Sequence, residues 1–239
     1  MFNQSAQFYD ALYHFKDYAA AAEQLHALIQ ETCPAATTLL DVACGTGKHL
    51  QYLRAHYEVE GLDLNGKLLE IARQRCPGVG LHEASMVDFN LGRSFDVVTC
   101  LFSSIGYVKT LDNMEKAISN MARHLNPGGV LFVEPWFSLE NYWTGKLTAN
   151  YVDQTDLKIA WMYISGLQGR TSVFDIHYLV GRPQGVHHFI ERHEMGLFAH
   201  EEYLEAFRKC RLDVRHDPTG LFGRDMYIGV NQNPRGPDR

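Results

Sequence analysis

Between residues 38 and 134, short apolar runs alternate with helical patterns, and this alternation constrains the fold more than any other feature of the sequence. The predicted strands are residues 39–43, 59–64, 79–82, 95–101 and 130–134. The predicted helices are residues 17–31, 47–56, 67–75 and 111–124. Because these strands are continuously apolar, they are typical of a parallel sheet that helices cover on both faces. The sequence therefore predicts the α/β class with a Rossmann-like, doubly wound sheet.

After residue 137 the pattern changes to extended segments joined by short turns. The next predicted strands are residues 157–164, 170–180 and 186–197, with hairpin signals at 167–169 and 182–185. We expect these strands to form an antiparallel β insert over residues 138–197. The main domain then comprises residues 1–137 and 198–239. Its last predicted elements are a helix at 200–210 and strands at 212–215 and 226–230.

A glycine-rich turn, DVACGTGKHL at residues 41–50, follows the first predicted strand. It lacks the third glycine of the GxGxxG dinucleotide pattern, because Leu50 stands there. It also fails the phosphate-loop pattern, because Gly47-Lys48 is followed by His49. Asp63 ends the next strand, where its two carboxylate oxygens can accept both hydroxyls of a ribose. The alternative for Asp63 is a cap at the amino end of the following helix.

Over residues 36–135, the sequence resembles the class I S-adenosylmethionine (SAM)-dependent methyltransferases. The resemblance rests on the glycine turn, Asp63 and the Asn126-Pro127-Gly128-Gly129 turn, which follow one another as in that family. The resemblance implies SAM as the cofactor. It implies that the cofactor contacts Tyr18, Ala43, Gly45, Gly47, Asp63, Leu64, Ser85, Met86, Phe102 and Ser103. Tyr18 is expected to reach the methionyl carboxylate. Ser85 stands where an Asp commonly contacts the adenine, so Asp88 is an alternative, and Met86 either packs on the ring or belongs to the core.

Several longer segments narrow the resemblance further, namely LLDVACGTGKHL, CLFSSIGYVKT, LNPGGVLFVEPWF and GLFGRDMYIGV. Together with the amino-terminal segment and the insert, they resemble N-methyltransferases that act on nucleotide-linked amino sugars of macrolide-type antibiotics. The resemblance implies that the methyl acceptor is a dTDP-linked deoxy amino sugar. The alternatives are another small amine or hydroxyl acceptor, a SAM-binding protein without catalysis and, more distantly, an NAD enzyme.

The chemistry that this acceptor requires is modest, because a sulfonium methyl group is already activated and a neutral amine is a good nucleophile. Proximity and orientation then supply most of the catalysis. Tyr107 is the predicted catalytic residue, as a hydrogen-bonding partner of the amine, although it is a poor base at its ordinary pKa. The predicted substrate-binding residues are Trp136, Phe137, His177, Tyr178, His193 and Arg224. Arg224 suits a pyrophosphate, and the two aromatic residues Trp136 and Phe137 suit an apolar wall.

Composition excludes several other classes of protein. The formal net charge of −6 disfavours a nucleic-acid substrate. The five cysteines are scattered without CxxC spacing, which disfavours a metal site or a disulfide framework and favours a reducing compartment. We find no signal peptide and no apolar stretch long enough for a membrane span, so we expect a cytoplasmic protein. The insert is expected to form a pocket wall, a homodimer contact or both.

Overall fold

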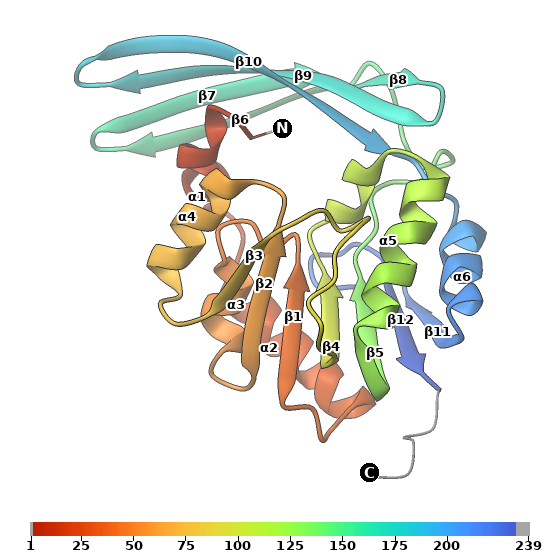
Figure 1. Ribbon diagram of the computed structural model, residues 1–239. Coiled ribbons are helices and arrows are strands. Elements are labelled where there is room, and N and C mark those ends of the chain that lie inside the picture. Colours follow the sequence, from red (N-terminus) through yellow and green to blue (C-terminus); the bar gives the residue numbers. More distant parts are fainter. Residues whose placement is uncertain (1, 233–239) are drawn as a thin grey trace.

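The larger of two sheets carries the doubly wound fold in the computed structural model, which describes residues 2–232 (Figure 1). Its seven strands have the order β11-β12-β5-β4-β1-β2-β3. Their bounds are β1 (Thr38–Val42), β2 (Glu58–Asp63), β3 (Gly80–Glu83), β4 (Phe95–Cys100), β5 (Leu125–Val133), β11 (Leu212–Asp217) and β12 (Met226–Asn231). Strands β1 to β5 run parallel, and β12 is antiparallel to both its neighbours. The strand order reverses between β1 and β4, which is where ligands bind in open α/β sheets.

Helices cover both faces of this sheet, as the sequence predicts. On one face, α2 (Tyr18–Thr32), α3 (Lys48–Leu53) and α4 (Gly66–Arg75) bury their apolar side chains. On the other face, α5 (Leu111–Arg123) and α6 (His200–Lys209) do so. Each strand of the centre is therefore enclosed in a core on both sides, which explains its continuously apolar sequence.

The antiparallel sheet lies over the carboxyl ends of the parallel strands (Figure 1). Its strands are β6 (Leu147–Gln154), β7 (Leu157–Ile164), β8 (Gly166–Gln168), β9 (Thr171–Arg182) and β10 (Gly185–Gly196). Their order is β10-β9-β7-β6, with β8 paired to β9. The antiparallel insert is thus confirmed, but β6 and β8 were not predicted from the sequence.

The amino-terminal segment, residues 2–17, crosses the space between the two sheets, and we call it the strap. It contains two short helical turns that the sequence analysis did not predict, η1 (Ser5–Phe8) and α1 (Tyr9–Leu12). Glu191 of β10 accepts the backbone N–H groups of Asn3 and Gln4 at 2.7 and 2.6 Å, and it also binds Ser5. Burial alone would raise the pKa of Glu191, but these bonds lower it below its usual range. An ionised carboxylate therefore holds the strap to the insert.

One detail of the main domain differs from the sequence-based expectation. The Asn126–Gly129 turn was predicted to precede the fifth strand, but β5 already begins at Leu125 and shifts register against β4 at this point. His124 follows the last residue of α5 and is buried, as expected for a helix C-terminus. Residues 1 and 233–239, assigned above to the main domain, lie outside the described residues. None of the described helices is long and apolar enough to cross a membrane.

Candidate active site

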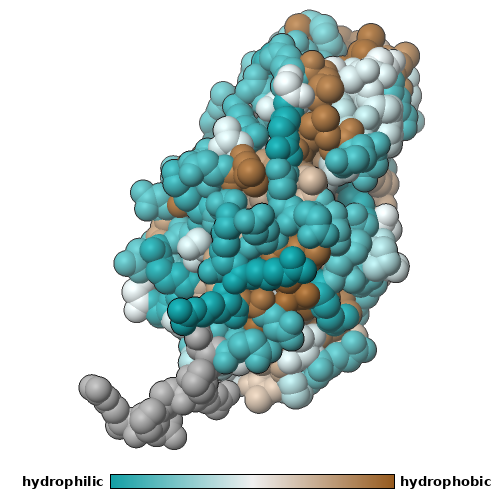
Figure 2. All heavy atoms as spheres, turned by 90° about the vertical axis from the view of Figure 1, so that its right-hand side faces the viewer, coloured by the Kyte–Doolittle hydropathy of each residue, from teal (hydrophilic) through white to brown (hydrophobic). Residues whose placement is uncertain are grey.

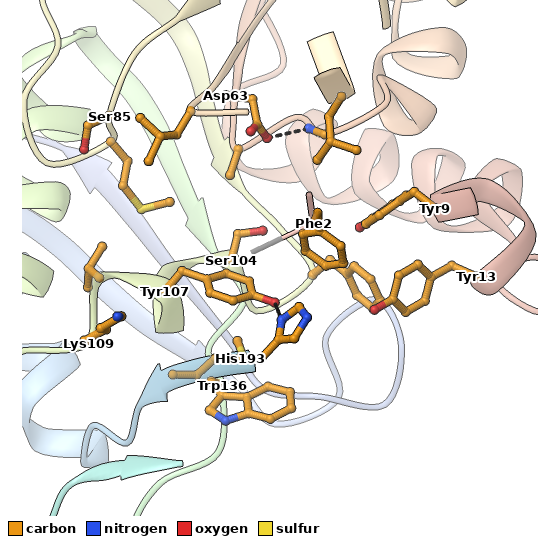
Figure 3. Close-up of a pocket in the computed structure, with 18 of the residues that line it drawn as sticks. Phe2, Tyr9, Tyr13, Asp63, Ser85, Ser104, Tyr107, Lys109, Trp136 and His193 are labelled. Carbon is orange, nitrogen blue, oxygen red and sulfur yellow. Dashed lines mark hydrogen bonds between the residues drawn. The ribbon is translucent and has the colours of Figure 1, made fainter. Parts of the chain in front are cut away.

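A cavity of about 630 Å³ lies between the carboxyl edge of the larger sheet, the insert and the strap. Figure 3 shows Asp63 and Ser85 at one end, and Tyr107, His193 and Trp136 at the other. Phe2, Tyr9 and Tyr13 of the strap line it from a third side. Its volume is in the usual range for small-molecule sites, and its two ends have different chemistry.

Asp63 presents its carboxylate to the first end of the cavity. The oxygen Oδ2 accepts the Gly45 N–H at 2.8 Å, and Oδ1 accepts the Asn65 N–H at 2.8 Å. One lone pair on each oxygen remains available, which fits the two hydroxyls of a ribose. Burial raises the pKa of Asp63, and the backbone bonds oppose that shift. The helix-cap alternative for Asp63 is wrong, because Asn65 caps α4 by accepting from the Lys67 and Leu68 N–H groups.

The glycine turn brings backbone close to the ligand space, but its two glycines do different things. Ala43 and Gly45 line the cavity, and both have positive φ angles, +63° and +56°. A Cβ atom at Gly45 would meet no described atom within 4 Å, so the space above it is open. Gly47 lies outside the cavity, where a Cβ would come within 3.2 Å of the Ala72 Cβ. Its direct contact with the cofactor, expected from the sequence, is therefore not supported, and its role is close packing of α3 against α4.

The side chains beside Asp63 form an apolar surface suited to a nucleobase. Leu64, Met86 and Ser85 line the cavity, as expected. The Leu64 side chain is 61% exposed at the cavity mouth, although it is apolar. The Ser85 hydroxyl oxygen accepts the Val87 N–H at 3.3 Å, which leaves its proton available to a ligand. Asp88, the alternative adenine partner, faces a separate groove beside α5.

Phe102 and Ser103 follow β4 in the middle of the site. The Phe102 ring lines the cavity, and the Lys16 ammonium of the strap lies 4.1 Å from its centre and 3.8 Å from that of Phe222. Burial lowers the pKa of Lys16 to about 8. Ser103 is buried beneath the cavity surface and accepts a hydrogen bond from Arg224 at 2.9 Å.

Tyr18, predicted to reach the methionyl carboxylate, lies outside the cavity. Its ring packs edge-on against His49, with the ring centres 5.1 Å apart, and is nearly buried. The cation that does face the cavity nearby is Lys16. The prediction for Tyr18 is therefore not supported, because the turn before α2 directs Lys16 inward instead.

Tyr107 and His193 meet at the second end of the cavity, one from η2 (Ser104–Val108) and one from β10. The Tyr107 hydroxyl lies 2.9 Å from His193 Nδ1 (Figure 3). Burial raises the pKa of Tyr107 well above its usual value and lowers the pKa of His193 to about 4. Both groups are therefore neutral at pH 7. The His193 Nε2 atom is buried and has no hydrogen-bond partner among residues 2–232.

Arg224 and Trp136 complete this end. The guanidinium of Arg224 lies over the rings of Trp136 and Phe137, 5.3 and 5.5 Å from their centres. Trp136 and Arg224 line the cavity, whereas Phe137 stands behind them. The indole N–H of Trp136 donates to Ser172 at 3.0 Å, so its orientation is fixed.

Two predicted substrate residues of the insert do not reach the cavity. His177 is exposed on the outer face of the antiparallel sheet, where its Nδ1 lies 3.3 Å from His188 Nε2. Its predicted place in the pocket is wrong, because residues 174, 176 and 178 turn inward and 177 turns outward. Tyr178 faces inward but is buried in the cluster formed with the strap and stacks on Phe189.

Several residues that line the cavity were not among the predicted site residues. They are Phe2, Tyr9, Tyr13, Lys16, Trp161, Tyr163, Phe174, Met195 and Phe222. Phe222 lies in the segment GLFGRDMYIGV, and Tyr9, Tyr13 and Lys16 lie in the amino-terminal segment, but no specific contact was predicted for any of them. The polar residues at 175 and 177 did carry a signal, because their alternation with apolar residues indicates which face of β9 is inward.

Comparison with known proteins gives consistent matches over almost the whole chain. The family model described as a methyltransferase domain matches residues 39–129. The dTDP-3-amino-3,6-dideoxy-alpha-D-glucopyranose N,N-dimethyltransferase of Streptomyces fradiae is 40% identical, over 94% of this chain and 90% of its own. The dTDP-4-amino-2,3,4,6-tetradeoxy-D-glucose N,N-dimethyltransferase of Saccharopolyspora spinosa is 38% identical, over 94% and 92%.

Solved structures agree with these relatives. The crystal structure of Streptomyces venezuelae DesVI superposes with a TM-score of 0.91 at 38% identity, over 95% of this chain and 98% of that one. The SAM-bound structure of CalS10, described as an amino pentose methyltransferase of Micromonospora echinaspora, gives 0.86 at 34% identity, over 97% and 98%.

Proposed function

The chain belongs to the family of dTDP-amino-sugar N,N-dimethyltransferases and is a SAM-dependent methyltransferase, and we propose that its acceptor is the amine of a dTDP-linked deoxy amino sugar. The observation that carries the proposal is the neutral Tyr107–His193 pair, which lies across the cavity from Asp63. This arrangement supports a cavity that holds the cofactor at the Asp63 end and the amine at the Tyr107 end. The net charge of −6 further supports a small acceptor over a nucleic acid.

When bound, SAM supplies a methyl group on a sulfonium. We propose that Asp63 binds the ribose, because its carboxylate oxygens each keep a free lone pair beside the open space above Gly45. Leu64 and Met86 then cover the adenine, and the Ser85 hydroxyl donates to it. Lys16 takes the role first assigned to Tyr18, because its cation faces the cavity and suits a carboxylate.

At the second end, we propose that Tyr107 and His193 orient the amine. A neutral imidazole offers one N–H and one acceptor nitrogen. With the Tyr107 hydroxyl donating to Nδ1, the phenol oxygen is free to accept an amine N–H, and this points the amine lone pair toward the methyl group. The neutrality of His193 also matters, because Lys16, Lys109 and Arg224 already place cations in the cavity that receives the sulfonium.

Arg224 is the proposed ligand of the diphosphate. One of its nitrogens is engaged with Ser103, and the planes of Trp136 and Phe137 hold the guanidinium in place. Its remaining N–H groups suit phosphate oxygens in a fork geometry. Trp136 then serves as the apolar wall for the deoxy sugar.

The test is calorimetry followed by turnover. S-adenosylhomocysteine should bind the purified protein, and dTDP should then bind that complex but not the Arg224→Ala variant. Incubation with SAM and a dTDP-linked 3-amino or 4-amino sugar should give methylated product by mass spectrometry, whose mass shows whether one or two groups are added. Cofactor binding without dTDP binding or turnover would contradict the acceptor assignment.

We also propose that the chain forms a homodimer through the outer face of the antiparallel sheet. Its exposed apolar residues are Leu147, Tyr151, Met162, Ile164, Leu179, Val186 and Ile190. Charges at its ends pair internally, Asp153 with Lys158 and Arg192 with Asp175, so the face is nearly neutral and suits a second copy of itself.

The size of this outer face is compatible with a dimer. Four strands ~4.8 Å apart, two of eight and two of twelve residues, cover about 500 to 750 Å² per copy, near the lower limit for a specific interface. In Figure 2, hydrophobic side chains also reach the surface at the upper end, which the insert occupies.

We further propose that the protein acts in the cytoplasm, because the thiols of Cys44, Cys76 and Cys100 are free and buried, as in proteins of a reducing compartment.

A further inference from the structure

Two consecutive residues that are not glycine, Phe102 and Ser103, adopt left-handed backbone conformations one residue after the end of β4. The φ angles are +55° at Phe102 and +60° at Ser103. A side chain makes this conformation unfavourable, so it persists only where neighbouring groups hold it. Phe102 lines the cavity beside Lys16, and the strained turn therefore lies within the site itself.

Two side chains from distant parts of the chain hold this turn. Glu134, directly after β5, accepts the Phe102 N–H through Oε2 at 2.6 Å. Arg224, in the segment before β12, donates to Ser103 Oγ at 2.9 Å. Each residue of the turn therefore has a side-chain partner of its own.

Glu134 differs from the other carboxylates of the site because it is fully buried. Its exposed fraction is 0%, and Oε1 has no hydrogen-bond partner in the part of the chain that the structure describes. Burial raises the pKa of Glu134, whereas the Phe102 bond and the cations of Lys16 and Arg224 oppose that shift. Glu134 thus lies beneath the cavity surface, as the buried partner of groups that do line it.

We propose that Glu134 is a positioning residue, which holds the Phe102–Ser103 turn left-handed and thereby fixes Phe102 and Lys16 at the cofactor. The proposal rests on the function proposed above for the cofactor end of the cavity. Glu134 itself touches neither cofactor nor acceptor, and its effect passes through the backbone of Phe102.

The test uses three variants and the binding of S-adenosylhomocysteine, which needs no acceptor. Glu134→Gln keeps an oxygen that accepts the Phe102 N–H, so affinity should stay within about twofold of the parent protein. Glu134→Met fills the same space without an acceptor, and affinity should fall about tenfold. Adding Ser103→Gly to the Met variant should recover much of that loss, because glycine adopts the left-handed turn freely. Glu140→Ala, at an exposed carboxylate, is the matched control.

Each outcome decides the proposal. A positioning role is supported if Ser103→Gly restores the affinity of the Glu134→Met variant. It is also supported if Glu134→Met folds only when Ser103→Gly is present as well. A Gln variant as weak as the Met variant, or a Met variant that fails in both backgrounds, overturns it, because the turn is then not what Glu134 serves. If the parent protein binds S-adenosylhomocysteine but methylates no sugar nucleotide, the proposed acceptor fails while this comparison still stands.

Discussion

The hydroxyl of Tyr107 lies 2.9 Å from Nδ1 of His193, although 86 residues separate them in the sequence. The contact joins η2, at the carboxyl edge of the parallel sheet, to β10 of the insert. The end of the cavity that we propose for the acceptor therefore forms where the two sheets meet.

Replacing Tyr107 by Phe removes the hydroxyl but keeps the ring. We expect kcat to fall about tenfold, because one orienting hydrogen bond is lost, with a smaller change in the KM for SAM. Steady-state kinetics against each substrate check this. His177→Phe, on the outer face of the same insert, is the control and should leave both constants unchanged; an equal loss in that variant would contradict the assignment.

Asp63→Ala should weaken S-adenosylhomocysteine about tenfold to 100-fold. It removes charged acceptors for two ribose hydroxyls and frees the Gly45 and Asn65 N–H groups. Calorimetry measures the change. Asp88 faces another groove beside the site, so the Asp88→Ala variant should bind S-adenosylhomocysteine as tightly as the parent protein does. If the Asp88 variant is the weaker one, the adenine or ribose contact lies there.

The lowered pKa of Lys16 predicts a pH dependence of cofactor capture. Above about pH 8 the ammonium of the free enzyme loses its proton, and with it the charge that attracts a carboxylate. The kcat/KM for SAM should therefore fall above about pH 8, while kcat changes less because a bound carboxylate favours the protonated lysine. Lys16→Arg, which stays charged, should remove the alkaline fall. A profile unchanged by that substitution would show that another group titrates.

His49 should make the protein sensitive to acid. It is buried, and burial lowers its pKa from about 6.5 to about 4. Between these values the unfolded chain binds the extra proton and the folded chain does not, so stability falls as pH falls. The free energy of unfolding should drop by about 2 kcal/mol between pH 7 and pH 5 from this residue. Denaturant titrations of the parent protein and of His49→Met at pH 7 and pH 5 should show a smaller drop in the free energy of unfolding for the variant.

The outer face of the insert predicts the oligomeric state. Leu179→Glu, near its centre, should convert a dimer to a monomer, because two buried carboxylates would face each other. Light scattering after gel filtration gives the mass directly. Leu139→Glu makes the same change at an exposed leucine outside both sheets and should leave the dimer intact. A parent protein that elutes as a monomer at micromolar concentration would refute the interface.

The sequence predicted the parallel sheet well because its central strands are buried on both faces and leave a strong signal. β6 left almost none, since only Val152 of its eight residues is buried and the others are polar or exposed. His177 was predicted on the wrong face of β9. The alternation of apolar and polar residues along that strand could have shown that residue 177 points outward. Gly45 and Asp63 line the cavity, and both could be singled out in the sequence because each lies at or just after the end of a buried strand.

The inward-facing side chains of the strap could not be predicted from the sequence, for a different reason. Lys16 enters the cavity and Tyr18 does not, although both were close enough in the sequence to do so. Which one points inward depends on the path of a segment with only short helical turns, and that path is set by Glu191 and Asp10 through long-range contacts. Glu134 lies in the segment LNPGGVLFVEPWF, but nothing in that segment indicated the positioning role proposed above, which follows from the backbone angles of Phe102 and Ser103.

The anchoring of the strap has a practical consequence for preparing the protein. The Phe2 ring lies 5.0 Å from that of His193, centre to centre, and Glu191 holds the residues that follow it. A purification tag fused upstream of Phe2 would join the chain beside the proposed acceptor site and compete with this docking. β12, by contrast, ends at Asn231 beside Asn126, at the edge of the sheet away from the cavity. Kinetic constants measured on protein tagged at the amino end would therefore include the effect of the tag on the docking of the strap.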